Sequence, residues 1–298
     1  MSATSSDKEW LENAEQAEST NSHASEYPTH PLSQLQGPFE ESITESADPK
    51  YLQWQVFIDT QSRRDQILTS PKYERLCGRR WRQRPGERYH PLWKIVAQIS
   101  FGLHLLANDL AKSEIHVVKI LQTHVSDIDG FIERTTDDLQ LALNDITERF
   151  DLLRLPLENL SIFSEMLEDP TFRQSVIIDN ERIEHIITRS TLAMDDSLKD
   201  IRKGNESVNG LAFYIKEVGK EWVDRPPELD PICEAMVGNV DGWNRELRRL
   251  KRSVHKLAIA LTQMTRYSLE IQRLVGVASR KGVVLPSSFP SIKLTKKC

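Results

Sequence analysis

Apolar residues recur at every third or fourth position through the proline-free stretch from Leu92 to Leu153. This is the pattern of an amphipathic helix with one buried stripe. A single helix of this length would extend for about 95 Å at 1.5 Å per residue. The apolar stripe skips from Leu110 to Val117, so a restart of the helix near Ser113 is the alternative.

The same spacing predicts two further long helices, over about 171–222 and 232–280. The proline-rich segment 224–231 cannot be helical and separates them. Asp169-Pro170 has the sequence of a helix cap followed by the first helical residue. We expect Pro156 to kink or end the first long helix, because proline clashes with the preceding turn.

The third long helix has the most regular pattern in the chain. From Trp243 to Ala278 its apolar positions alternate steps of four and three, with Ser268 as the single polar position. This register is typical of a coiled-coil seam. None of the three helices can bury its stripe alone, and short turns force them to alternate in direction.

We therefore predict an all-α fold: an elongated antiparallel three-helix bundle with a short N-terminal helix and disordered termini. The long three-helix bundle would occupy residues 91–281, and 282–298 would be a flexible C-terminal tail. Residues 48–90 would form short helices and a basic, aromatic connector. The first short helix would begin at Asp48-Pro49 and end near Thr69, and Pro71 would open a second.

Residues 1–47 are predicted to be a disordered tail rich in acidic residues and serine. They contain nine acidic residues and one base. Such a segment buries too little apolar surface to offset the entropy lost on ordering.

Composition excludes several classes of protein. Charged residues make up 28% of the chain and apolar residues 39%, which suits long helices with narrow seams. The net charge of −5 makes nucleic acid an unlikely partner. The three cysteines have no paired spacing, and we find neither a signal peptide nor an apolar run long enough to span a bilayer. The sequence thus predicts a cytoplasmic protein, with peripheral membrane association as the alternative.

No motif predicts catalysis, a cofactor or a bound metal. The paired Glu-x-x-His ligands of a di-metal bundle and the His-Glu-x-x-His motif are absent, as are glycine-rich phosphate loops. We therefore predict a protein that is not an enzyme and has no small-molecule substrate. A deep polar pocket with converging acids and histidine would revive the enzyme hypothesis.

A row of bases on the third helix is the strongest candidate for binding. These bases, on the faces away from the seam, are Arg245, Arg248, Arg249, Lys251, Arg252 and Lys256. The row could bind anionic lipid, at about 1 kcal/mol per base. Alternatively it meets acidic helix faces in the same chain or in a second copy, because residues 127–169 contain twelve acidic residues and three bases. We favour the second interpretation.

The connector is the other candidate for binding. It interleaves aromatic residues with bases. The candidate binding residues are the bases Arg79, Arg80, Arg82 and Arg84 and the aromatic Trp81. Such a segment could bind phosphates or an anionic membrane. The alternative is a strap over the acidic bundle with Trp81 inserted in the seam, which we favour because Pro85-Gly86 forms a turn.

Several segments are similar to a family of filamentous-fungal helical proteins of unknown function, over roughly residues 50–280. The segments that carry the resemblance are 89–96, 101–106, 131–138 and 183–187. The resemblance implies a fungal, intracellular, helical protein, and it assigns no functional residues.

Our leading hypothesis is a non-enzymatic intracellular helical scaffold, a protein-interaction module that acts as a homo-oligomer or with a helical partner through its long helices. The second is a peripheral membrane-binding module, like the crescent-shaped helical dimers (BAR-like) that sense curvature, which would use the basic row on the third helix.

Overall fold

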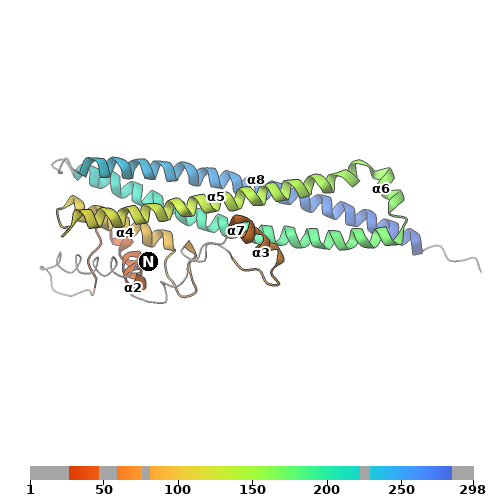
Figure 1. The fold of residues 1–298 in the computed structure, drawn as a ribbon, viewed down its shortest axis with the longest axis horizontal. Helices are drawn as coiled ribbons and strands as arrows, with labels where there is room; N and C mark the ends of the chain where they lie inside the picture. Colours follow the sequence, from red (N-terminus) through yellow and green to blue (C-terminus); the bar gives the residue numbers. More distant parts are fainter. Residues whose placement is uncertain (1–26, 47–58, 76–80, 222–228, 284–298) are drawn as a thin grey trace, which may run out of the picture.

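The computed structural model describes residues 27–46, 59–75, 81–221 and 229–283, and these ranges contain helices and no strand. The helices are α2 (Ser33–Ser46), α3 (Thr60–Thr69), α4 (Pro91–Ala107), α5 (Glu114–Glu158), α6 (Leu160–Met166), α7 (Pro170–Glu221) and α8 (Asp230–Val283). The predicted all-α class is confirmed. Figure 1 shows α5, α7 and α8 side by side along the long axis, with α7 running opposite to the other two.

Helix α8 is the central element of the packing. It contacts both α5 and α7 extensively, whereas α5 and α7 have little direct contact. At one end, which we call the proximal end, α4 packs against both α5 and α7, and α2 packs on α4. At the other, distal end the short α6 joins α5 to α7 (Figure 1). The two ends are therefore built differently, with α4 and α2 thickening the proximal end.

The prediction of one unbroken helix from Leu92 to Leu153 is wrong, because this stretch forms two helices, α4 and α5. The chain leaves helical geometry after Ala107, and Asp109 has a positive φ of 54°. Ser113 then caps α5, because its side chain accepts a hydrogen bond from the backbone N–H of His116. The restart near Ser113 is confirmed. The break lets α4 fold back on α5, so that its apolar surface is buried among α2, α5 and α7.

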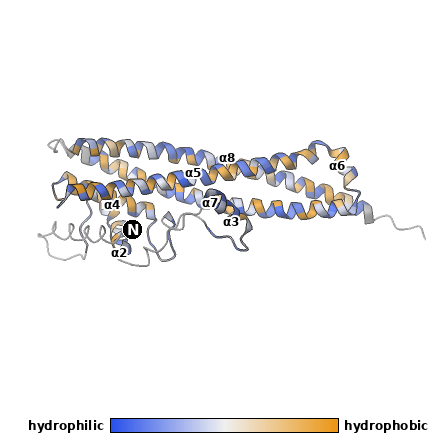
Figure 2. Cartoon of the chain, in the orientation of Figure 1, coloured by the Kyte–Doolittle hydropathy of each residue, from blue (hydrophilic) through white to orange (hydrophobic). Residues whose placement is uncertain are grey.

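The predicted seam of α8 is confirmed almost residue for residue. Its members from Trp243 to Val275 are all at most 6% exposed, whereas Ala278 is half-buried. The polar position is explained by a partner, because the Ser268 hydroxyl donates to Asn180 Oδ1 of α7 at 3.0 Å. Figure 2 shows hydrophobic and hydrophilic residues alternating along this helix, as a one-sided seam requires.

The proline-marked boundaries hold with two corrections. Asp230-Pro231, predicted to lie in the non-helical segment 224–231, begins α8, since proline is tolerated in the first turn of a helix. Residues 222–228 lie outside the described residues. α7 begins at Pro170, and Asp169 accepts hydrogen bonds from the N–H groups of Thr171 and Phe172, as predicted. Pro156 lies inside α5, which runs on to Glu158. Proline at this position removes only one backbone hydrogen bond, and α5 ends two residues later. Asn159 is the C-cap, and its N–H donates to the backbone oxygen of Leu155.

The predicted N-terminal disorder is wrong for residues 27–46. These include α2, which buries Leu35, Phe39 and Ile43 against α4. The spacing of these three residues at i, i+4 and i+8 is an apolar helical face that the surrounding acids and Pro38 obscure in the sequence. Residues 1–26 lie outside the described residues.

The predicted short helices are partly correct. α3 ends at Thr69 as expected, but its cap is Asp59, whose carboxylate accepts from the N–H of Ser62 at 2.9 Å. Asp48-Pro49 lies outside the described residues. The helix expected after Pro71 is absent from 71–75, where Tyr73 and Arg75 contact α7, and 76–80 lie outside the described residues.

Candidate interaction surface

The six bases of the third helix, which we call the α8 bases, lie along the outside of the molecule. Five of them are exposed and Lys251 is half-buried. Arg249 approaches Glu246 of the same helix at 3.8 Å. Within the described residues, the other five form no ion pair. The sequence left open whether these bases meet an acidic face of the same chain, and no ion pair joins them to α5 or α7 in the described ranges.

A shallow groove between α5 and α8 runs beside these bases. It is lined by Leu143, Asn144, Thr147, Glu148 and Asp151 of α5 and by Lys256, Ile259, Ala260 and Gln263 of α8. Residues seven apart lie on the same side of a helix, so Arg249 is on the same side of α8 as Lys256. Arg245 and Arg252 lie on the neighbouring side. One wall of the groove is therefore basic.

The opposite wall is acidic. Glu148 and Asp151 line it from α5, and both are exposed. Ile259, with 47% of its surface exposed, and the half-buried Leu143 also line the groove. The groove thus combines a base of α8, acids of α5 and apolar side chains.

The connector lies against the bundle as a strap. Trp81 Nε1 donates to the backbone oxygen of Asp127 at 3.0 Å, and its ring meets that of Phe131 edge to face at 6.2 Å. A Cβ at Gly130 would lie 3.3 Å from the Trp81 ring, so glycine permits this close contact. Trp81 is half-buried and packs on α5, which agrees with a strap over the bundle, and its insertion into the seam stays a prediction.

The bases of the connector are divided. Arg82 is exposed and Nη1 donates to the backbone oxygen of Arg75 at 3.4 Å. Arg84 is half-buried and approaches Glu87 at 3.7 Å. Arg79 and Arg80 lie outside the described residues. The described bases of this segment are therefore engaged within the chain.

Buried ion pairs attach the N-terminal segments to the bundle. Arg63 of α3 pairs with Asp138 of α5 at 2.6 Å, and Arg64 pairs with Asp145 at 2.6 Å. Burial raises the pKa of Asp138 even though Arg63 opposes the shift. Arg63 and Arg64 are only 5% and 6% exposed, although their helix has almost no apolar face. The charges, rather than apolar contacts, position α3.

A second buried set surrounds Lys94 of α4, which is 4% exposed. Its ammonium lies 2.8 Å from Glu41 of α2 and 3.6 Å from Glu87, and it also contacts Glu45. Burial raises the pKa of Glu45. Burial also acts to raise the pKa of Glu41, but the hydrogen bond and charge of Lys94, together with backbone hydrogen bonds from Tyr89 and Arg88, outweigh it and the pKa falls. One lysine thus joins α2, α4 and the strap.

Asp200 of α7 joins the strap to the start of α4. It is 3% exposed, contacts Arg75, and accepts from His90 Nε2 at 3.0 Å. Burial acts to raise the pKa of Asp200, but the hydrogen bonds from His90 and Arg75 outweigh it and lower the pKa. His90 also caps α4, since Nδ1 accepts from the N–H of Leu92 at 3.2 Å.

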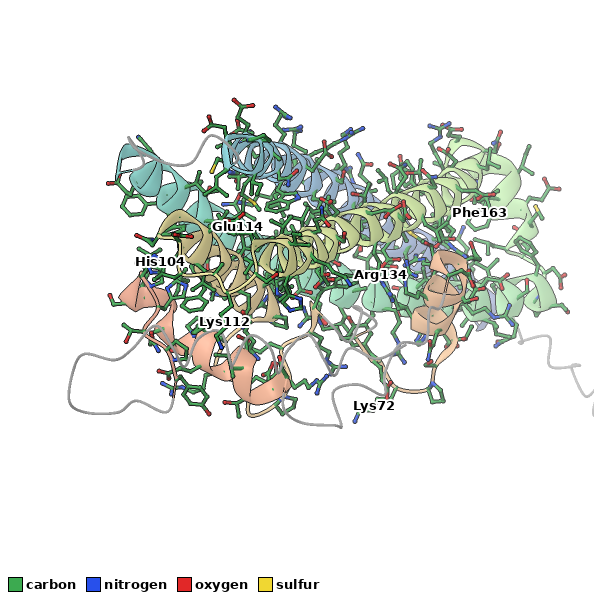
Figure 3. The ribbon with its side chains drawn as sticks, turned by 60° about the vertical axis from the view of Figure 1, so that its left-hand side comes forward. Lys72, His104, Lys112, Glu114, Arg134 and Phe163 are labelled. Carbon is green, nitrogen blue, oxygen red and sulfur yellow. The ribbon has the colours of Figure 1, made fainter. Side chains whose placement is uncertain are left out.

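A cavity of about 70 Å³ lies where the strap crosses α5 and α7. Its charged lining residues are Arg64, Arg75, Arg134, Asp138, Asp196 and Asp200. Tyr73 donates to Asp196 at 2.9 Å, and burial raises the pKa of Tyr73. Figure 3 shows Arg134 midway along the bundle. Among the described lining residues there is no histidine, and bases and acids are equal in number.

The sequence analysis missed the buried charges of the proximal end. Lys94 carries a usable signal, because it is the one charged residue in the otherwise apolar run of α4, and lysine is almost never fully buried without a partner. Arg63 and Arg64 carry no such signal. In the described residues no group of three His, Cys, Asp or Glu side chains could hold a metal ion.

Two further findings bear on the function. Among the described helices, none combines the length and the apolar character needed to cross a lipid bilayer. In comparisons with known proteins, no family model, curated protein or solved structure matches the chain. The resemblance to a fungal helical family therefore stays a prediction.

Proposed function

We propose that this protein is a helical scaffold whose three long helices act together as an elongated antiparallel bundle and bind a partner along the groove between α5 and α8. One observation carries the proposal: five of the six α8 bases are exposed and none is paired across the groove in the described residues, whereas Arg63, Arg64 and Lys94 are buried in ion pairs.

The two walls of the groove define the chemistry of the partner. An amphipathic helix with acids on one flank, bases on the other and an apolar stripe between them would match both walls. A second copy of this chain can supply such a helix, since α8 has bases and α5 has acids. Pairing of exposed charges would set register and orientation more than affinity, which would come from the apolar contacts.

Anionic membrane is the second candidate, because a row of exposed bases attracts anionic lipid by about 1 kcal/mol per base. The acidic wall argues against it. A flat anionic surface close enough to contact Arg249 and Lys256 would also approach Glu148 and Asp151, and the like charges would repel.

Photo-crosslinking from the groove tests the proposal. A photoreactive residue at Ile259, which is exposed, should capture a helical protein or a second copy in cells of the native host. The adduct should be lost with Arg245→Glu, Arg249→Glu and Arg252→Glu. The matched control reverses three exposed bases of α7, Arg182, Lys199 and Lys203, and should leave the adduct unchanged.

Two results would overturn it. One is an adduct that both triple variants weaken equally. The other is flotation with anionic vesicles that the α8 variant abolishes and the α7 variant does not, which would support the membrane function instead.

A further inference from the structure

The distal end exposes an apolar surface that the groove does not include. Five large apolar side chains are exposed there, and we call them the tip surface. They are Leu152 (63% exposed), Leu155 (53%), Leu160 (48%), Ile162 (59%) and Met166 (46%). They fall within one short stretch of the chain around the turn from α5 into α6. Large exposed apolar patches on a folded protein are typical of interaction sites.

Helix α6 has apolar side chains on two neighbouring faces, and only one of these faces is buried. Phe163 and Leu167 are buried against Ile271 and Val275 of α8. Figure 3 shows Phe163 at the far end of the bundle from Glu114. Ile162 and Met166, four residues apart, share the outer side of α6 and remain exposed. Neither Ile162 nor Met166 belongs to a buried cluster in the described residues.

The charges around the tip surface restrict what can cover it. Residues 151–169 contain five acidic residues and one base, Arg154. Arg154 is already paired with Glu158 at 3.0 Å, whereas Glu165 and Glu168 form no ion pair within the described part of the chain. A second tip surface or an anionic membrane would bring like charges together. The occupant must therefore be apolar and basic.

We propose that residues 284–298 of the same chain dock on the tip surface. Their apolar residues are Val284, Leu285, Phe289, Ile292 and Leu294, and their bases are Lys293, Lys296 and Lys297. This segment contains no acidic residue. It therefore has both properties that the acid-rimmed apolar surface requires.

The position of α8 brings this segment within reach. Val275 packs against the inner side of α6, and α8 ends at Val283, eight residues or about 12 Å further on. Fifteen residues span up to about 50 Å when extended. A short tether of this kind gives an effective concentration of about millimolar, so weak apolar contacts are enough for occupancy.

Paramagnetic broadening of methyl signals tests the proposal in the full chain. A nitroxide is attached to Cys298 after Cys77→Ser and Cys233→Ser, and the methyl signals of Ile162 and Met166 are recorded. We expect both signals to lose most of their intensity. Ile115, about 60 Å from Leu155 along α5, should keep its intensity.

Two variants separate docking from mere tethering. Lys293→Glu, Lys296→Glu and Lys297→Glu reverse the charge, and Leu285→Ser, Phe289→Ser and Ile292→Ser remove the apolar contacts while keeping the length. Each should reduce the broadening at Ile162 several-fold. Equal broadening in all three chains, or none in the parent chain, would overturn the proposal.

A mixture controls for contact between copies. Isotope-labelled chain without nitroxide is mixed with unlabelled chain that carries it, and Ile162 should stay sharp. Broadening in this mixture would show that the segment of another copy covers the tip surface, which contradicts docking within one chain.

Discussion

The proximal and distal ends of this molecule use charge in opposite ways. Where the N-terminal segments attach, at the proximal end and midway along the bundle, ion pairs are buried and join elements far apart in sequence, such as Lys94 with Glu41 and Arg64 with Asp145 (Figure 1). At the distal end, the ion pairs lie within one helix and are exposed, such as Arg154 with Glu158. There the helices are joined by apolar seams and by hydrogen bonds such as that of Ser268 with Asn180, and by no buried ion pair among the described residues.

This difference separates structural charges from charges that can bind a partner. A buried ion pair fixes which segments meet, because removing one partner leaves a desolvated charge. An exposed pair within a helix contributes little to stability and is screened by salt. The charged residues that line the groove, Glu148, Asp151 and Lys256, form no buried ion pair in the described residues and can bind a partner without disturbing the helices.

The largest effect is expected at Lys94. Lys94→Met should lower the free energy of unfolding by about 3–5 kcal/mol, because Glu41, Glu45 and Glu87 would lose their shared cation. Urea unfolding followed by circular dichroism measures it. Adding Glu41→Gln and Glu45→Gln should recover part of the loss. Lys199→Ala, at an exposed lysine, is the control. If Lys94→Met lowers the free energy of unfolding no more than this control does, the proposed difference between the two ends is wrong.

The second prediction concerns acid and His30, which holds α2 on α4. Burial lowers the pKa of His30 to about 4, and hydrogen bonds to the backbone of Ala97 and Leu32 only partly oppose this. Because the unfolded chain takes up the proton at about 6.5, this contribution is complete above pH 6.5. It should be lost as pH falls to 4, by about 3 kcal/mol.

Hydrogen exchange of α2 measures this effect. As pH falls from 6.5 to 4, the backbone amides of Leu35, Phe39 and Ile43 should become less protected. Their exchange rates are compared with those of an unfolded peptide at the same pH. His30→Gln retains a side-chain donor for Ala97 and should flatten the dependence. An equal acceleration in that variant would assign the effect to other groups, among them Glu41 and Glu45.

A smaller effect is expected in the seam between α7 and α8. Ser268→Ala leaves Asn180 Oδ1 without its donor and should cost about 1–3 kcal/mol. Ser268→Ala combined with Asn180→Leu should cost less than the two changes added together, as a double-mutant cycle would measure. Additive costs would mean that the hydrogen bond does not couple the two helices.

The smallest effect is expected for the α8 bases. Arg245→Glu, Arg249→Glu and Arg252→Glu together should change the free energy of unfolding by about 0.5 kcal/mol or less, because all three side chains are exposed. Thermal unfolding followed by circular dichroism checks this. A large loss of stability would show that these bases support the fold and would remove the basis for the proposed groove.

Local patterns in the sequence determined the long helices and their faces. The seam from Trp243 to Val275 could be predicted because each buried position repeats at helical spacing. Asp169-Pro170 marked the start of α7 because a cap is a contact between near neighbours. The α8 bases could be placed opposite the seam for the same reason.

Only the tertiary structure decided how the N-terminal segments attach and which charges are buried. Arg63 meets Asp138, and Lys94 meets Glu41, across separations that no local periodicity encodes. The exposure of Ile162 and Met166 likewise depends on the side of α6 that meets α8. Helical spacing defines faces within an element, whereas burial and pairing depend on what the folded chain brings against each face.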